Sequence, residues 1–127
     1  MTHKILYIED NSDNMRLIQR VLEAHGYIVY GAGNGLEGIS MAEDIKPDMI
    51  LVDINLPDID GYEVVRRIRS SEETDLHSVI IIAITANVLI GDAEKAITAG
   101  CDAYLPKPVN IRELSARVEM YLSRGTE

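Results

Sequence analysis

The sequence predicts an α/β fold in which helices cover both faces of a five-stranded parallel sheet, the doubly wound arrangement. Short apolar runs alternate along the chain with segments whose apolar residues recur every three or four positions. Residues 79–84 are apolar throughout, which is typical of a strand buried on both faces. The connections between the runs are short, so successive parallel strands must be joined by right-handed helical crossovers.

The first half of the chain contains two strand–helix units. Residues 4–8 read as a buried strand, and residues 12–25 carry an apolar helical face that Gly26 can end. Residues 27–30 form a second, more exposed strand. A helix then begins near Asn34 and ends before Pro47, because the residue ahead of a proline resists the helical region.

The second half repeats this alternation three times. The expected strands are residues 49–52, 79–84 and 102–105. The expected helices carry their apolar faces on residues 61–68, 90–97 and 111–122. Five strands therefore alternate with five helices.

Length and composition indicate one domain. A chain of 127 residues, 46% of them hydrophobic, can build a core without disulfides or metals. We expect a single domain over residues 1–127, with an ordered part of about residues 3–123. Cys101 is the sole cysteine and fits a core position in a reducing compartment. Because neither a signal-peptide pattern nor an apolar stretch of membrane-spanning length is present, we expect a cytoplasmic protein without membrane insertion.

The charge balance argues against one class of partner. Twelve basic and twenty-one acidic residues give a formal net charge of −9, which opposes attraction to a phosphate backbone. Direct nucleic-acid binding is therefore not expected.

Chemically active side chains stand where the predicted strands end. Glu9 and Asp10 follow the first strand, Asp53 the third, Thr85 the fourth and Lys107 the fifth. The carboxyl ends of parallel strands meet at one edge of the sheet, so these side chains should converge in one crevice. The combination predicts a phosphoryl-transfer site.

Four motifs at these strand ends carry a family resemblance. They are residues 8–11 (Ile-Glu-Asp-Asn), residues 52–57 (Val-Asp-Ile-Asn-Leu-Pro) followed by Asp60-Gly61, residues 84–86 (Ile-Thr-Ala) and residues 100–108 (ending Leu-Pro-Lys-Pro). Through them the chain resembles, over essentially its whole length, the receiver domains of two-component response regulators, the CheY-like superfamily. The resemblance implies the flavodoxin-like strand order 2-1-3-4-5, with the first and fifth helices on one face of the sheet and the other three on the opposite face.

The resemblance also implies roles for the acids. A carboxylate attacks a phosphoryl group poorly unless a cation neutralises the phosphoryl oxygens. Asp53 resembles the family's phosphoacceptor, although an aspartate at a strand end can also serve a turn. Glu9, Asp10 and Asp53 supply hard oxygen ligands for Mg²⁺ or Mn²⁺, Glu9 directly or through water, and the family adds the backbone carbonyl at the position of Asn55. Asn55 and Asn87 hold positions that tune dephosphorylation in the family.

The remaining site residues are expected to read out the phosphoryl group. Thr85 would donate a hydroxyl hydrogen bond and Lys107 a charge-assisted contact to its oxygens. Before phosphorylation, Lys107 should pair with a carboxylate, and by resemblance the Lys107–Pro108 bond is cis. Thr85 would move on phosphorylation and Tyr104 would swing into the space, which changes a surface made by the fourth helix, fifth strand and fifth helix. Tyr104 is otherwise an ordinary strand aromatic.

The implied partners are a histidine kinase or histidine phosphotransfer protein as donor and a downstream target protein. The protein would be a monomer or a weak, phosphorylation-dependent dimer. Residues 88–90 (Val-Leu-Ile) cannot all face one core stripe and are a partner-contact candidate. In the family the donor docks on the first helix, whose outer residues here are Asn14, Arg16, Leu17 and Arg20.

An aspartate-nucleophile phosphatase is the alternative from another functional class. Such enzymes typically need a second acid two residues after the nucleophile and a cap domain, but here Asn55 holds that position and the chain has no room for a cap. A receiver that works without phosphate is disfavoured because the five key side chains are present. The resemblance implies self-phosphorylation and slow autodephosphorylation rather than multi-turnover catalysis. A receiver cut from a hybrid histidine kinase or phosphorelay and a stand-alone, DivK-like regulator both remain open.

Overall fold

The sheet has the predicted parallel topology. The computed structural model describes residues 2–72, 74–86 and 92–124, and within these ranges five parallel strands lie in the order β2-β1-β3-β4-β5. The strands are β1 (Lys4–Ile8), β2 (Ile28–Ala32), β3 (Met49–Asp53), β4 (Ile80–Thr85) and β5 (Ala103–Pro106). The predicted fold class and strand order are confirmed.

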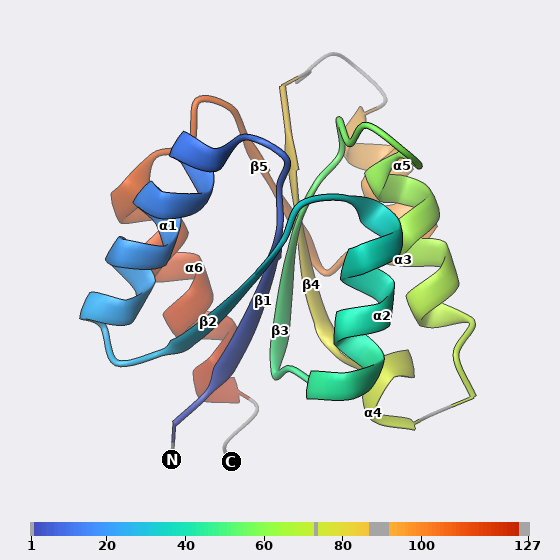
Figure 1. Ribbon diagram of the computed structural model, residues 1–127, viewed down its shortest axis with the longest axis horizontal. Coiled ribbons are helices and arrows are strands. Elements are labelled where there is room, and N and C mark those ends of the chain that lie inside the picture. Colours follow the sequence, from blue (N-terminus) through green and yellow to red (C-terminus); the bar gives the residue numbers. More distant parts are fainter. Residues whose placement is uncertain (1, 73, 87–91, 125–127) are drawn as a thin grey trace.

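Helices cover both faces of this sheet (Figure 1). Within the described ranges they are α1 (Ser12–Ala24), α2 (Gly35–Ile45), α3 (Gly61–Arg69), α4 (Thr74–His77), α5 (Asp92–Ala99) and α6 (Ile111–Arg124). Helices α1 and α6 lie on one face, and α2, α3 and α5 on the other, as expected. The single-turn α4 between α3 and β4 was not predicted; Leu76 anchors it with its side chain 2% exposed.

Two apolar layers separate the sheet from its helices. On the α2, α3 and α5 side the core includes Leu6, Ile8, Val52 and Val64, and on the α1 and α6 side it includes Ile5 and other residues of the same strands. Strand β3 is buried along its whole length, as the continuous apolar run predicts. Cys101 is a buried free thiol whose pKa burial raises to about 12, so it behaves as the expected core residue.

Strand β2 extends further along the chain than predicted. It covers residues 28–32 rather than 27–30, because Gly31 and Ala32 pair with Tyr7 and Ile8 of β1. These two residues have weak intrinsic strand preference, which is why the pattern missed them. A methyl group added to Gly31 would lie 2.7 Å from Met15 Sδ of α1, so glycine permits this close packing.

Capping side chains fix where the helices begin. Asn11, Asn34 and Asp60 each accept a hydrogen bond from the backbone N–H three residues later, at 2.8–2.9 Å. Helix α2 has a second acceptor, Asp58, whose two carboxylate oxygens accept the N–H groups of Gly35 and Leu36 at 2.8 Å each. Because Asp58 lies in the loop after β3, it ties that loop to the start of α2.

Helix α1 ends one residue earlier than predicted. His25 is its exposed C-cap rather than part of the apolar face, and Gly26 follows with a φ of 93°. This left-handed conformation ends the helix at little steric cost for glycine.

Arg69, the last residue of α3, joins the segments at the amino edge of β4 and β5. Its guanidinium donates to the backbone carbonyls of three residues, His77, Val79 and Gly100. It also forms an ion pair with Asp102 at 3.0 Å. The Asp102 carboxylate in turn accepts the N–H of Ile81 at 2.8 Å, so one side chain connects α3, α4, β4 and the turn before β5.

No helix within the described ranges combines the length and the apolar composition that a membrane-spanning segment needs.

Candidate functional site

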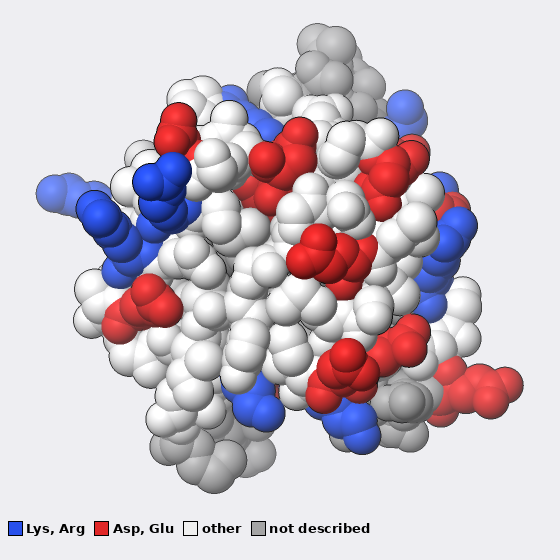
Figure 2. All heavy atoms as spheres, in the orientation of Figure 1, with Lys and Arg blue, Asp and Glu red and all other residues white. Residues whose placement is uncertain are grey.

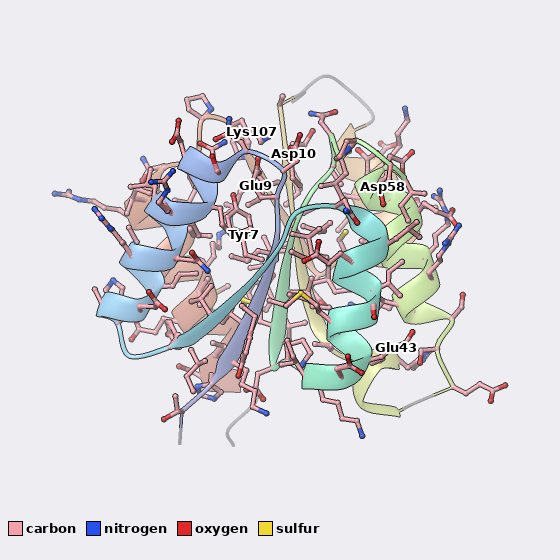
Figure 3. The ribbon with its side chains drawn as sticks, in the orientation of Figure 1. Tyr7, Glu9, Asp10, Glu43, Asp58 and Lys107 are labelled. Carbon is pink, nitrogen blue, oxygen red and sulfur yellow. The ribbon has the colours of Figure 1, made fainter. Side chains whose placement is uncertain are left out.

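The predicted acids meet at the carboxyl edge of the sheet. Glu9 follows β1 and Asp53 ends β3, and with Asp10 each offers one carboxylate oxygen, all within 4.8 Å of one another. Glu9 and Asp53 are 2% and 1% exposed, whereas Asp10 faces solvent. Figure 3 shows Glu9, Asp10 and Lys107 gathered at this edge, far from exposed acids such as Glu43. The sequence therefore placed three acids correctly in one cluster.

Lys107 supplies the cation of this cluster. Its Nζ lies 2.7 Å from Asp53 Oδ2 and 3.9 Å from Glu9 Oε2. The expected pairing of Lys107 with a carboxylate is confirmed, and so is the cis Lys107–Pro108 bond. The Lys107 N–H donates to the Thr85 carbonyl at 2.8 Å, which joins its loop to the end of β4.

Glu9 is held by neighbours on both carboxylate oxygens. Oε1 accepts the Asn11 N–H at 3.1 Å, and Oε2 accepts the Tyr7 hydroxyl at 3.2 Å. Burial raises the pKa of Glu9 to about 7, and a hydrogen bond to Asp53 and the charge of Asp53 act in the same direction. Burial and the charge of Glu9 also raise the pKa of the Tyr7 hydroxyl, so this hydroxyl stays protonated at neutral pH and donates a hydrogen bond to Glu9.

Tyr7 is a site residue that the sequence reasoning missed. It precedes Glu9 by two positions, and alternation along a strand puts both on one face of the sheet. Ile5 and Tyr7 pack in the layer under α1 and α6, which places Glu9 on that same side. This period-of-two relation was the signal that could have identified Tyr7.

The oxygen atoms of the cluster fit a small divalent cation. Three carboxylates from Glu9, Asp10 and Asp53 are hard donors of the type that Mg²⁺ prefers, and Mg²⁺ keeps waters on its open side. The exposure of Asp10 leaves such an open side. The Asn55 N–H donates to Asp53 Oδ1 at 3.0 Å, which fixes the loop that would carry the fourth, carbonyl ligand.

Thr85 and Tyr104 lie on the other face of the sheet. Thr85 ends β4 and is 4% exposed, and alternation places it on the side of Ala83, in the layer under α3 and α5. Tyr104 pairs with Ala83 in the ladder and packs half-buried against that layer. Both expected switch residues therefore share one face. Asn87 and the apolar stretch 88–90 lie outside the described residues.

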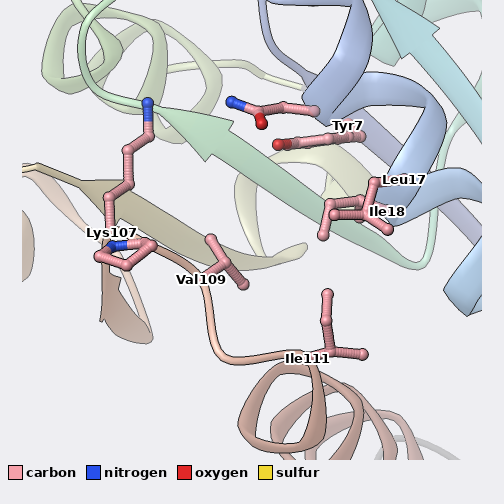
Figure 4. Close-up of a pocket in the computed structure, with 8 residues that line it drawn as sticks. Tyr7, Leu17, Ile18, Lys107, Val109 and Ile111 are labelled. Carbon is pink, nitrogen blue, oxygen red and sulfur yellow. The ribbon is translucent and has the colours of Figure 1, made fainter.

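A hollow of about 460 Å³ opens beside Lys107, between α1 and the loop before α6 (Figure 4). Its lining residues are Tyr7, Asn14, Leu17, Ile18, Lys107, Pro108, Val109 and Ile111. Leu17 is 51% exposed, and Arg16 and Arg20 also face solvent from α1. The outer face of the first helix thus lies beside Lys107, the cation of the carboxylate cluster.

Comparisons with known proteins agree with this geometry. Residues 5–119 match the family model described as the response regulator receiver domain. The polar-differentiation response regulator DivK of Brucella ovis is 37% identical over 122 residues, which cover 96% of this chain and 98% of that protein. A similar solved structure is the receiver domain of the sensor histidine kinase PA1611 from Pseudomonas aeruginosa, which was solved with a magnesium ion coordinated in its active site cleft. It has a TM-score of 0.87 at 37% identity, and the match covers 97% of this chain and 99% of that one. A two-component response regulator from Clostridium difficile gives a TM-score of 0.91 at 30% identity, covering 99% of this chain and 100% of that one. The chain belongs to the response regulator receiver domain family.

Proposed function

We propose that Asp53 accepts a phosphoryl group from a phosphohistidine of a histidine kinase or histidine phosphotransfer protein. An Asp53 carboxylate oxygen bonds to phosphorus as the phosphorus–nitrogen bond breaks, and the released imidazole takes up a proton. The observation that carries this proposal is the contact of Lys107 Nζ with Asp53 Oδ2 at 2.7 Å inside a cluster of three carboxylates. A buried aspartate with a cation already beside it is ready to receive a negatively charged group.

The metal ligands in this proposal are Glu9, Asp10, Asp53 and the backbone carbonyl of Asn55. A bound Mg²⁺ or Mn²⁺ would neutralise charge on the phosphoryl oxygens. Glu9 would hold the ion directly or through a water, and the exposed Asp10 would hold it on the side of the site that faces solvent. Lys107 passes from Asp53 to a phosphoryl oxygen after transfer, and Thr85 donates its hydroxyl to another.

The read-out surface in this proposal is formed by α5, β5 and α6. Tyr104 borders a hollow of about 360 Å³ with Ile97 of α5, Pro106 of β5 and Tyr121 of α6. An inward shift of Thr85 on the same face of the sheet makes room for Tyr104 and alters this hollow, where a downstream target protein binds. Asn55 and Asn87 tune the lifetime of the phosphoryl group.

The donor docks on α1, over the hollow beside Lys107. Leu17 and Val109 offer apolar contact next to the acceptor, so a donor helix that packs there brings its phosphohistidine toward Asp53. The reaction takes place in the cytoplasm, and each molecule carries one phosphoryl group without acting as a multi-turnover enzyme. DivK and the PA1611 receiver represent the two contexts in which this chain fits equally well, a response regulator and a receiver of a sensor kinase.

The acceptor assignment is tested with acetyl phosphate in Mg²⁺. Wild-type protein is expected to gain the mass of one phosphoryl group, and Asp53→Asn is expected to gain none, because the amide cannot form the acyl phosphate. Intact-mass spectrometry measures both. A phosphoryl group retained by Asp53→Asn would move the acceptor elsewhere, and continuous phosphate release from varied monoesters would favour a hydrolase.

The Lys107→Ala variant separates acceptance of the phosphoryl group from the change in target binding that the phosphoryl group causes. The variant is expected to take up the phosphoryl group, but its affinity for a target should no longer change on phosphorylation, because the charge that senses the phosphoryl oxygens is gone. Target binding is measured by calorimetry with and without acetyl phosphate. An affinity that shifts in Lys107→Ala as much as in wild type would remove Lys107 from the switch.

A further inference from the structure

Tyr7 is a large polar side chain in a position where strand residues are usually apolar. It is 1% exposed and packs with Ile5, Ile18 and Leu51 in the layer under α1 and α6. A hydroxyl taken out of water destabilises the fold unless it finds a hydrogen-bond partner. Here the partner is the carboxylate of Glu9, at 3.2 Å from the Tyr7 hydroxyl.

The two hydrogen bonds to Glu9 come from opposite directions along the chain. The Asn11 N–H holds Oε1 from the loop ahead, and the Tyr7 hydroxyl holds Oε2 from the strand behind. A carboxylate has about four acceptor sites, so these two hydrogen bonds leave acceptor capacity on Glu9 for a metal ion or its waters. The Glu9 side chain is thereby fixed in one orientation within the carboxylate cluster before a metal arrives.

Figure 4 shows the tyrosine ring lying between α1 and the Lys107 loop, on the wall of the hollow beside the site. The ring is thus held by packing, and its hydroxyl is aimed at the cluster rather than at solvent. A rigid donor of this kind differs from a surface side chain, which would lose rotamer freedom on binding Glu9.

We propose that Tyr7 is a positioning residue for metal binding, whose hydroxyl holds the Glu9 carboxylate in the orientation that the divalent cation requires. This inference rests on the metal site of the proposed function. Glutamate has one more rotatable bond than aspartate, and a second donor compensates for that freedom by ordering the side chain in advance. Residues that orient a metal ligand in this way typically change metal affinity about 10–100-fold when they are altered.

The test compares Tyr7→Phe with wild type in Mg²⁺ titrations by calorimetry. The variant keeps the ring and loses the hydroxyl, so we expect Mg²⁺ to bind about 10-fold more weakly. The rate of phosphorylation by acetyl phosphate should fall at low Mg²⁺ and return to within about twofold of wild type at saturating Mg²⁺, because the acceptor itself is untouched. Tyr30→Phe is the matched control, since Tyr30 is half-buried in β2 against the opposite core layer, and it should leave Mg²⁺ affinity unchanged.

A Glu9→Gln background shows whether Tyr7 acts through Glu9. In that background Tyr7→Phe should change Mg²⁺ affinity by less than about twofold, since the carboxylate that it orients is absent. An equal loss in both backgrounds, or unchanged Mg²⁺ affinity in Tyr7→Phe alone, would overturn the positioning role while the metal site stands. Absence of Mg²⁺ binding to wild-type protein would instead overturn the metal site and the positioning role together.

Discussion

At the scale of single residues, the site brings two buried carboxylates together, those of Glu9 and Asp53. Glu9 and Asp53 are both nearly inaccessible to solvent, and the Lys107 ammonium group lies closer to Asp53 than to Glu9. Glu9 is therefore the acid whose charge is least well compensated, and its pKa of about 7 lies far above its ordinary value of 4.5. Protonation of Glu9 stabilises the metal-free fold.

This shift predicts how stability depends on pH. Because the folded-state pKa of Glu9 is raised, its contribution is fully present below pH 4.5 and is lost as the pH rises through about 7. In a chelating buffer the free energy of unfolding should fall between pH 5 and pH 8 by on the order of 2 kcal/mol more in wild type than in Glu9→Gln. Urea denaturation at several pH values measures the difference, and parallel curves for the two proteins would contradict it.

The sequence predicted these side chains to different degrees. Glu9, Asp10, Asp53 and Lys107 could be placed together because each ends or closely follows a strand, and parallel strands bring their ends together. The role of the Tyr7 hydroxyl could not be predicted, because packing alone is a sufficient reason for an aromatic residue in a strand. Which carboxylate Lys107 prefers also depended on distances that spacing along the chain does not fix.

At the scale of secondary-structure elements, Arg69 holds the end of α3 to the segments before β4 and β5. Its side chain is 19% exposed, and its carbonyl partners lie at the end of α4 and directly after α4 and α5. By contrast, Arg67 on the same helix is 48% exposed and pairs with Glu63 within one turn. Removal of Arg69 therefore leaves several polar groups without their donor, whereas removal of Arg67 leaves only the exposed Glu63.

Arg69→Met is expected to lower the free energy of unfolding by about 3 kcal/mol, because Asp102 and three backbone carbonyls lose a charged donor. Arg67→Met should cost less than about 1 kcal/mol, as exposed pairs do. Urea denaturation of both variants tests the contrast. Similar losses in the two variants would show that the contacts of Arg69 add little.

Element boundaries were the least predictable part of the fold. The apolar pattern located the strands of the sheet, but β2 continues through Gly31 and Ala32, and at Gly31 the close packing of α1 favours glycine. Helix α4 has four residues, which is too short for an apolar period to show. The Asp58 cap on α2 joins residues more than 20 positions apart, and local sequence does not reveal it.

At the scale of the whole molecule, the formal charge of −9 is spread over the surface, with acids across the face in Figure 2 and most basic side chains toward its margins. The acids at the carboxyl edge add to this repulsion in the folded state. A divalent cation at this edge would reduce the repulsion. If it binds only the folded state, it also stabilises the whole fold by mass action.

Mg²⁺ at 100 times its dissociation constant is expected to raise the free energy of unfolding by about 2.7 kcal/mol. Asp10→Asn should lose most of this gain, because it removes one of the carboxylates that we propose bind the ion. Glu43→Gln, which changes the net charge equally at an exposed position on α2 distant from the site, should retain it. Urea denaturation with Mg²⁺ or NaCl at equal ionic strength measures both, and equal stabilisation by the two salts would indicate screening alone.

The close approach of α2 to β1 restricts how this scaffold diverges. Gly38 lies against Ile8, and a methyl group added at position 38 would come within 2.8 Å of Ile8 Cγ1. Ile8 directly precedes Glu9, so a displacement there would be transmitted to the acids. Positions 8 and 38 should therefore covary among related sequences. A residue larger than glycine at position 38 should be tolerated only where position 8 carries a side chain smaller than isoleucine, and the substitution at position 38 alone should be selected against.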